Sequence, residues 1–262
     1  MAINTPLMNV MVGAARKAAK ILTRDFGELE HLQASRKGPA DFVTQTDLRV
    51  ERALREELSR TRPHYGFVME EGGVVEGPDK THRWFIDPLD GTTNFIHGVP
   101  HFAISIGLER EGQLVAGLIF NPIRDELFIA EKGQGAWLND RRLRVSTRRE
   151  LNIALVATGI PFHGRPGHDE FLAELPRVMN QVAGVRRFGA ASLDMAFVAA
   201  GRFDAFWERG LSSWDLAAGT VILREAGGLV SDLEGGDNFL DGRQILASNS
   251  ALHPALLKCI RG

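Results

Sequence analysis

Apolar residues recur at helical spacing in two segments near the start of the chain. The first segment begins with Thr5 as a candidate N-cap and Pro6 in the first helical position, an order typical of helix starts. The second begins near Thr46 and Asp47 and ends at Leu58. The apolar positions on one helical face are Leu7, Val10, Met11, Ala14, Ala18 and Ile21 in the first segment and Val50, Ala53, Leu54 and Leu58 in the second. The pattern predicts two amphipathic helices.

The periodicity then changes to short β-rich runs. Four such runs span residues 84–87, 103–110, 113–120 and 126–131, and the connection between the second and the third carries a glycine, Gly112. Short apolar or alternating runs that are joined by glycine-containing turns indicate antiparallel hairpins. We therefore expect a sheet that is built mainly by meanders.

Helical and strand-like segments alternate in the second half of the chain, after Ser146. The expected strands span 153–159, 203–208, 228–233 and 245–249, and the expected helices span 168–182, 192–200, 214–226 and a closing segment after Pro254. This order predicts an α/β fold of the α+β type, in which helices form layers around two sheets. Periodicity alone leaves the order of the strands open.

Composition and charge narrow the class of protein. The chain has 262 residues, 44% hydrophobic content and a net charge of -2, so it has enough apolar surface for a core and no global field that would hold nucleic acid or an acidic membrane. Cys259 is the single cysteine, and we expect it to be a packed thiol. Arg16, Lys17 and Lys20 interrupt the apolar N-terminal run, which argues against an export signal. The expected location is the cytoplasm.

The densest chemical signal is the run from Trp84 to Phe95, WFIDPLDGTTNF. An apolar strand ends at Asp87, a proline bends the chain, and Asp90 and Gly91 follow, so two carboxylates leave a sheet edge together. Thr92 or Thr93 could cap a helix whose free amides would face a phosphate. The run therefore couples a candidate cation site to a candidate anion site. The alternative is an aspartate-rich turn whose side chains only cap the next helix.

Two further acidic features support the cation site. Glu70 and Glu71 follow the apolar segment 65–69, and Asp215 lies in the first turn of an expected helix after Trp214. Either feature alone is also typical of a solvated loop or of an acid that interacts with the helix dipole. Carboxylate ligands without histidine or thiolate partners suit a hard ion such as Mg²⁺. It is the joint occurrence of these motifs that favours a magnesium site.

The three acidic motifs together resemble the signatures of the inositol monophosphatase family. They are Glu70-Glu71, Asp-Pro-Leu-Asp-Gly-Thr at 87–92 and Trp-Asp-Leu-Ala-Ala-Gly at 214–219, and the resemblance extends through 41–47, 189–195 and 207–210. It implies a layered αβαβα sandwich, dependence on Mg²⁺ with two or three ions per active site, lithium sensitivity and a homodimer. It also implies one catalytic unit over 1–262, with an N-terminal lobe of about 1–146 and a C-terminal lobe of about 147–262.

The same resemblance implies a role for individual residues. The implied metal ligands are Glu70, Asp87 and the carbonyl of Leu89 for one ion, Asp87, Asp90 and Asp215 for a second, and Glu70 for a weaker third. Thr92 is expected to pair with Asp47 and, with Glu70, to help activate the attacking water. The implied substrate contacts are the amides of Gly91 and Thr92 for the phosphate, and Asp90, Ala191, Glu208 and Asp215 around the ester.

The resemblance implies a Mg²⁺-dependent phosphomonoesterase that hydrolyses myo-inositol monophosphate, or a related polyol or sugar phosphate, by metal-activated water. Glu208, Ser192 and Asp194 are of the type that reads hydroxyl groups, which suits a polyol phosphate. Members of the wider superfamily also use fructose 1,6-bisphosphate, histidinol phosphate or 3′-phosphoadenosine 5′-phosphate. Arg186 or Arg187 could face a second phosphate of such a substrate.

Other readings of the same residues carry less weight. A haloacid-dehalogenase-type phosphatase needs two aspartates two residues apart, whereas Asp87 and Asp90 are three apart. His97 and His101 could bind zinc, but a histidine pair in a Gly/Pro loop is more often scaffolding, and no third ligand has suitable spacing. Some bacterial members of the family also bind transcription machinery, and nothing in the sequence decides whether this chain does. We expect no membrane partner and no direct nucleic acid binding.

Overall fold

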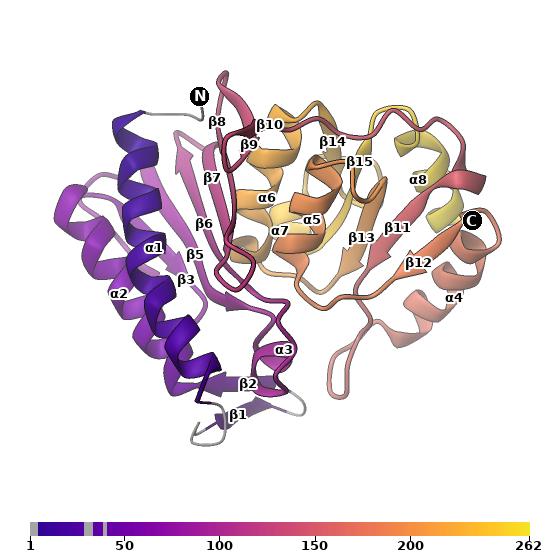
Figure 1. Ribbon diagram of the computed structural model, residues 1–262. Coiled ribbons are helices and arrows are strands. Elements are labelled where there is room, and N and C mark those ends of the chain that lie inside the picture. Colours follow the sequence, from indigo (N-terminus) through magenta and orange to yellow (C-terminus); the bar gives the residue numbers. More distant parts are fainter. Residues whose placement is uncertain (1–4, 29–33, 39–40) are drawn as a thin grey trace.

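The computed structural model describes residues 5–28, 34–38 and 41–262, which form five alternating layers of helices and sheets (Figure 1). Helices α1 (Pro6–Phe26) and α2 (Gln45–Thr61) cover the outer face of the first sheet. Helices α5 (Ala191–Ala199) and α6 (Ser213–Glu225) lie between the two sheets. Helices α4 (His168–Met179) and α8 (His253–Arg261) cover the outer face of the second sheet. The predicted αβαβα sandwich is confirmed.

The first sheet has the strand order β10-β9-β8-β7-β6-β5-β3-β4. Its strands are β3 (Gly66–Met69), β4 (Gly73–Val75), β5 (His82–Asp90), β6 (Ala103–Arg110), β7 (Gln113–Asn121), β8 (Glu126–Glu131), β9 (Gly135–Leu138) and β10 (Arg141–Arg142). Successive strands from β5 to β10 are antiparallel, so the predicted meander is confirmed. Strand β3 departs from it, because it pairs in parallel with β5.

The second sheet has the strand order β12-β11-β13-β15-β14. Its strands are β11 (Leu155–Thr158), β12 (Gly184–Arg186), β13 (Ala205–Arg209), β14 (Gly228–Ser231) and β15 (Gln244–Asn249). Strand β11 is parallel to β12 and β13, whereas β15 is antiparallel to β13 and β14. The predicted strand at 153–159 begins later, because a 3-10 turn occupies Leu151–Ile153. The predicted helix at 168–182 ends at Met179, and the sequence did not predict β12 or α7 (Phe239–Gly242).

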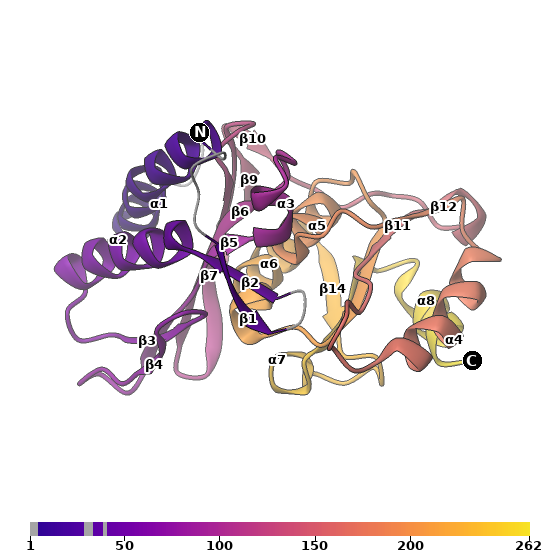
Figure 2. The same ribbon diagram turned by 90° about the horizontal axis from the view of Figure 1, so that it is seen from below.

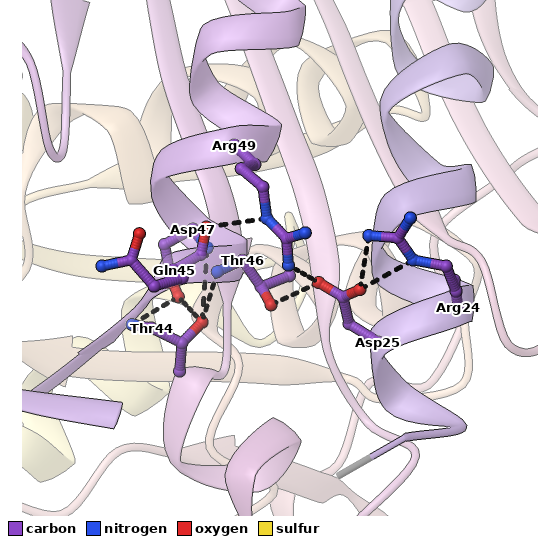
Figure 3. Close-up of polar contacts among 7 residues, drawn as sticks. All are labelled: Arg24, Asp25, Thr44, Gln45, Thr46, Asp47 and Arg49. Atoms are coloured by element: carbon purple, nitrogen blue, oxygen red, sulfur yellow. Dashed lines mark hydrogen bonds and ion pairs between the residues drawn. The ribbon is translucent and has the colours of Figure 1, made fainter. Parts of the chain in front are cut away.

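Side-chain caps fix where the two outer helices begin. The amide of Met8 donates to Thr5 Oγ1 at 3.1 Å, which confirms the predicted start of α1. Helix α2 begins one residue before the predicted Thr46, because Thr44 caps it and Asp47 accepts a hydrogen bond from the Thr44 amide at 2.9 Å. Figure 3 shows that Asp25 of α1 joins the two helices, accepting from Thr46 Oγ1 and from Arg49. These bonds hold Asp47 at a fixed place beside the sheet.

The central helices pack against the first sheet, and α6 approaches it closely. Every residue of α5 is buried, because a sheet lies on each side of this layer. Helix α6 approaches β7 at Gly117, where an added Cβ would stand well below 3.0 Å from the carbonyl oxygen of Ala218. Glycine at this position therefore permits backbone-to-backbone contact. This contact brings the N-terminal end of α6 to the edge of the first sheet.

A short hairpin closes the lower end of the molecule. Its strands β1 (Ala34–Gly38) and β2 (Asp41–Thr44) lie near the short helix α3 (Thr92–Ile96) in Figures 1 and 2. Strand β2 leads directly into α2, so the predicted motif at 41–47 spans the junction of the two elements. Among the residues that the structure describes, no helix combines the length and the apolar character needed to cross a bilayer.

Candidate active site

The first pair of acidic residues leaves β5 at a β-bulge. Asp87 is opposite Ser105 and Asp90 is opposite Ala103, so β5 carries one extra residue between its two aspartates. A bulge bends the strand and changes the direction of its side chains. The Leu89 amide donates to Asp87 Oδ1 at 2.9 Å, which fixes the turn. As a result both aspartates face the same cavity.

Glu70 reaches this cavity from the neighbouring strand. It directly follows β3, and its amide donates to the carbonyl oxygen of Ile86 in β5 at 3.2 Å. Because β3 and β5 are parallel, their carboxyl ends lie at the same edge of the sheet. The parallel pairing therefore places Glu70 beside Asp87, although they are seventeen positions apart in the sequence.

Asp215 lies in the first turn of α6 and enters the cavity from the layer between the two sheets. The Ser212 amide donates to Asp215 Oδ2 at 2.7 Å, which is one half of a capping box. The side chain also forms a hydrogen bond with the carboxyl group of Asp87. Two carboxyl groups approach this closely only when a proton or a cation offsets their like charges. The contact therefore indicates that Asp87 and Asp215 share a proton or a bound cation.

Asp90 is held by the start of α5. Its Oδ2 atom accepts hydrogen bonds from the amide of Ser192 at 2.8 Å and from Ser192 Oγ at 2.5 Å. The expectation that Ser192 reads a substrate hydroxyl is not met in this geometry, because the residue is fully buried and absent from the cavity lining. Asp194 is also buried and does not line the cavity. The structure thus assigns Ser192 the task of orienting Asp90.

Thr92 and Asp47 form the expected pair. Thr92 Oγ1 lies 3.2 Å from Asp47 Oδ1 and 3.0 Å from the carbonyl oxygen of Leu89, and either oxygen can accept its proton. Asp47 is buried and does not line the cavity, but Thr92, which lines it, is its hydrogen-bond partner. The predicted threonine cap of the following helix is wrong: Gly91 is the N-cap residue of α3, in the left-handed region with φ of 94°, and no side chain caps this helix.

The cavity that these residues share has a volume of about 510 Å³. The sequence-predicted residues that line it are Glu70, Asp87, Leu89, Asp90, Gly91, Thr92, Ala191, Glu208 and Asp215. The lining residues that the sequence did not identify include Gly159, Ile160, Phe162, Arg165, Arg209, Arg243 and Gln244. Arg187 lines the cavity and Arg186 does not. The missed residues come from the loop after β11, from the end of β13 and from the start of β15, where no acidic or glycine-rich motif marks them.

The electrostatics of the cavity are dominated by like charges. Burial, followed by Glu70, Asp90 and Asp215, raises the pKa of Asp87 well above its usual value. Burial raises the pKa of Asp90 to about 6 although Ser192 hydrogen bonds oppose the shift, and burial with the Asp90 charge raises the pKa of Asp215 to about 8. The acids thus destabilise one another as anions. A cation in the cavity would remove this penalty.

The donor set fits a hard divalent ion. All candidate ligands are oxygens, from four carboxyl groups and the carbonyl of Leu89, and Mg²⁺ prefers such ligands. In the described ranges no group of three or more acidic, histidine or cysteine side chains has a geometry that could hold a metal ion without a shift of side chains. An open set is compatible with Mg²⁺, which keeps several waters and binds substrate oxygens. The carboxyl groups of Asp87 and Asp215 are in contact, so a cation bound between them would offset their like charges.

The two histidines that were considered as zinc ligands lie apart from this cavity. The His101 ring packs against Phe188 and Phe197, with ring centroids 5.1 Å and 5.8 Å away. Burial lowers the pKa of His101 to about 4. His97 Nδ1 is 2.8 Å from the carbonyl oxygen of Thr93. Both histidines thus act as scaffold residues, as expected from the Gly/Pro loop.

Comparison with known proteins points to one family. The model of the Inositol monophosphatase family matches residues 3–261. An inositol-1-monophosphatase of Caulobacter vibrioides is 58% identical over 254 residues, which cover 96% of this chain and 99% of the relative. The Nus factor SuhB of Pseudomonas aeruginosa is 46% identical over 260 residues, covering 98% and 96%. A crystal structure of the extragenic suppressor protein suhB of Bartonella henselae matches with a TM-score of 0.95 at 53% identity, covering 98% and 99%.

Proposed function

This chain belongs to the inositol monophosphatase family and is a phosphoric monoester hydrolase, and we propose that it hydrolyses myo-inositol monophosphate, or a related polyol or sugar phosphate, with Mg²⁺. The observation that carries the proposal is the meeting of Glu70, Asp87, Asp90 and Asp215 in one cavity. Three separate elements supply these acids, and the charges that act most strongly on the aspartates are other carboxylates. Such a cluster is stable as anions only with bound cations.

We assign the metal ligands as the resemblance implies. Glu70, Asp87 and the Leu89 carbonyl would hold one Mg²⁺, Asp87, Asp90 and Asp215 a second, and Glu70 a weaker third. When bound, the ions supply charge stabilisation for the phosphate oxygens and a nucleophile at neutral pH. Hydrolysis of phosphate monoesters requires large rate enhancements, and general acid–base catalysis alone gives about 10²–10⁴-fold. The rest of the rate enhancement must come from another source, and in this chain the acidic cluster, by binding the ions, can supply it.

The remaining site residues orient the substrate and the attacking water. Thr92 Oγ1 donates its proton to Asp47 Oδ1 or to the Leu89 carbonyl, so its lone pairs face the cavity and can accept a proton of water. Glu70 is assigned to assist in that proton transfer. The amides of Gly91 and Thr92 would bind the phosphate group. Ala191, Glu208, Asp90 and Asp215 would surround the alcohol.

The test is phosphate release from inositol 1-phosphate, fructose 1,6-bisphosphate, histidinol phosphate and 3′-phosphoadenosine 5′-phosphate. Each substrate is assayed with Mg²⁺, with EDTA and with Mg²⁺ plus Li⁺. We expect Mg²⁺-dependent and Li⁺-inhibited release, fastest from inositol 1-phosphate. No release from any of the four would contradict the proposed activity. Faster release from a bisphosphate would favour Arg187, which lines the cavity, as a contact of the second phosphate.

A second function is a regulatory role in transcription. Its support is the 46% identity to the relative that is named Nus factor SuhB. A binding role of this kind does not require the catalytic carboxylates, so their loss should be tolerated. The variant Asp87→Asn should then lose phosphatase activity and still bind purified antitermination factors or RNA polymerase. Failure of the unmodified chain to bind any of them would exclude the role.

We further propose a homodimer in the cytoplasm and a division into lobes of about 1–146 and 147–262. The homodimer rests on the family resemblance, and light scattering at micromolar concentration measures it directly. A mass near the 28.8 kDa of one chain would contradict it. The lobe division follows the boundary between the two sheets, since the first ends with β10 and the second begins with β11.

A further inference from the structure

Glu208 packs against Gly159, the residue that directly follows the neighbouring strand β11. A Cβ placed on Gly159 would stand well below 3.0 Å from Cδ, Oε1 and Oε2 of Glu208, and these are its three nearest atoms. Ordinary van der Waals contact begins at 3.4 Å, so any side chain at position 159 would have to displace the carboxyl group. Gly159 leaves room for the Glu208 carboxyl group only because glycine has no Cβ.

The strand pairing explains why these two residues meet. Thr158 of β11 is the parallel partner of Trp207 of β13, so the residues that follow them lie side by side at the carboxyl ends of the strands. The Thr158 hydroxyl donates to the carbonyl oxygen of Trp207 at 2.9 Å and thereby fixes the end of the pair. Both Gly159 and Glu208 line the active-site cavity.

The glycine is not needed for its backbone freedom. Gly159 is absent from the residues with positive φ, so an alanine would fit the backbone at this position. Gly159 is also buried, and its nearest neighbours are all atoms of one side chain. What the position supplies is therefore space for that side chain and not an unusual turn.

The Glu208 carboxyl group faces the cavity without a protein donor. In the described part of the chain no hydrogen bond to it is formed, and the charges that act on it are those of Asp215, Asp90 and Arg187. A carboxylate that is held in a cavity in this way is available to a ligand hydroxyl. Its exact placement then matters, because hydrogen bonds weaken steeply with distance and angle.

We propose that Gly159 is a positioning residue for substrate specificity: the space it leaves holds the Glu208 carboxyl group toward the bound alcohol and so sets the affinity for substrates with a hydroxyl within its reach. This inference rests on the proposed phosphatase function. It concerns the alcohol side of the cavity and not the metal ligands. Gly159 acts only through Glu208, so its effect must depend on that carboxyl group.

The test compares Gly159→Ala with the unmodified enzyme on two substrates. We expect KM for inositol 1-phosphate to rise about three- to tenfold, because a hydrogen bond to the Glu208 carboxyl group is lost. KM for p-nitrophenyl phosphate, which has no hydroxyl, and kcat for either substrate should change less than about twofold. The matched control is Gly13→Ala in α1, since a Cβ there would meet nothing within 4 Å and Gly13 does not line the cavity. An equal rise for both substrates, or no rise, would overturn the inference.

The variant Glu208→Ala separates positioning from a general structural effect. In that background Gly159→Ala should have no further effect on KM, because the displaced carboxyl group is gone. If Gly159→Ala alone fails to fold, the double variant should recover folding, and a double variant that also fails would refute the inference. Absence of phosphate release by the unmodified enzyme would refute the proposed function instead, so the two failures are distinguishable.

Discussion

Burial and nearby charge decide the protonation state of single residues in this chain. Asp87, Asp90 and Asp215 are pushed toward their protonated forms by burial and by one another. His101 is pushed toward its neutral form, because its ring is packed among phenylalanines and Arg124 lies nearby. The raised pKa values of the aspartates concern the active site, whereas the lowered pKa of His101 concerns the stability of the fold. Each has consequences that can be measured separately.

His101 should make the protein less stable in mild acid. Its pKa is about 4 in the folded chain and about 6.5 in the unfolded chain, so only the unfolded chain takes up the proton between these values. The contribution to stability is complete above pH 6.5 and is lost as the pH falls toward 4, by about 2 kcal/mol at pH 5. Urea unfolding of His101→Gln should show a correspondingly flatter pH profile from 7 to 5.

The exposed His97 on the same loop is the control for that measurement. His97→Gln makes the same substitution on the same loop at a solvent-exposed side chain, so it controls for the glutamine itself. Parallel profiles for the unmodified chain and His101→Gln would show that the buried ring does not titrate as described. The comparison uses differences in slope, so a constant packing cost of either substitution does not affect it.

At the scale of elements, the sequence predicted local structure well and lateral arrangement poorly. The bounds of β6 and β8 match the expected runs, because alternating apolar residues and turn residues mark them. Strand β12 was missed since it has only three residues, and the parallel pairing of β3 with β5 depends on contacts distant in sequence. The acidic ligands were predictable from motifs. The loop that begins at Gly159 was not, because its contribution is space and not a functional group.

Helix α2 supports the site through a second acidic residue. Glu51 is one turn after Asp47 on the same helix face and accepts a hydrogen bond from the Glu71 amide at 2.8 Å. We expect Glu51→Ala to loosen the Glu70 loop and to raise the Mg²⁺ concentration for half-maximal activity about three- to tenfold. Glu51→Gln keeps an acceptor and should be milder. Calorimetric titration with Mg²⁺ checks the same order, with the exposed Glu56→Ala as control.

Two glycine substitutions should have opposite effects on stability. Gly117→Ala places a methyl group against the backbone of α6 and should lower the free energy of unfolding by about 1–3 kcal/mol. Gly13→Ala lies in exposed α1 with nothing within 4 Å, and it should raise that free energy by about 0.5–1 kcal/mol. Urea denaturation of both variants measures the difference. Equal values would mean that α6 does not pack closely on β7.

At the scale of the whole molecule, the central helices join the two sheets into one core. A single cluster of buried residues includes Ile119 and Phe128 of the first sheet and Phe206 and Ile245 of the second. The active site also draws on both halves, since Asp87 comes from the first sheet and Glu208 from the second. The two proposed lobes therefore follow one another in the sequence, but they share one core, and we do not expect them to fold independently.

The shared core predicts one cooperative unfolding transition. The calorimetric and van't Hoff enthalpies should agree, and circular dichroism and tryptophan fluorescence should give the same midpoint. Trp84 reports on the first sheet and Trp207 on the second, and both are buried. Two resolved transitions would show that the halves at about 1–146 and 147–262 fold separately.

The most direct test of the central claim is phosphate release from inositol 1-phosphate as Mg²⁺ is titrated, with Asp90→Asn measured beside the unmodified chain. We expect no release in EDTA, saturable activation by Mg²⁺, and turnover at least about 10²-fold lower in Asp90→Asn with an unchanged circular dichroism spectrum. Release that is independent of Mg²⁺, or near-normal turnover in a folded Asp90→Asn, would contradict the assignment of the acidic cavity as the catalytic metal site.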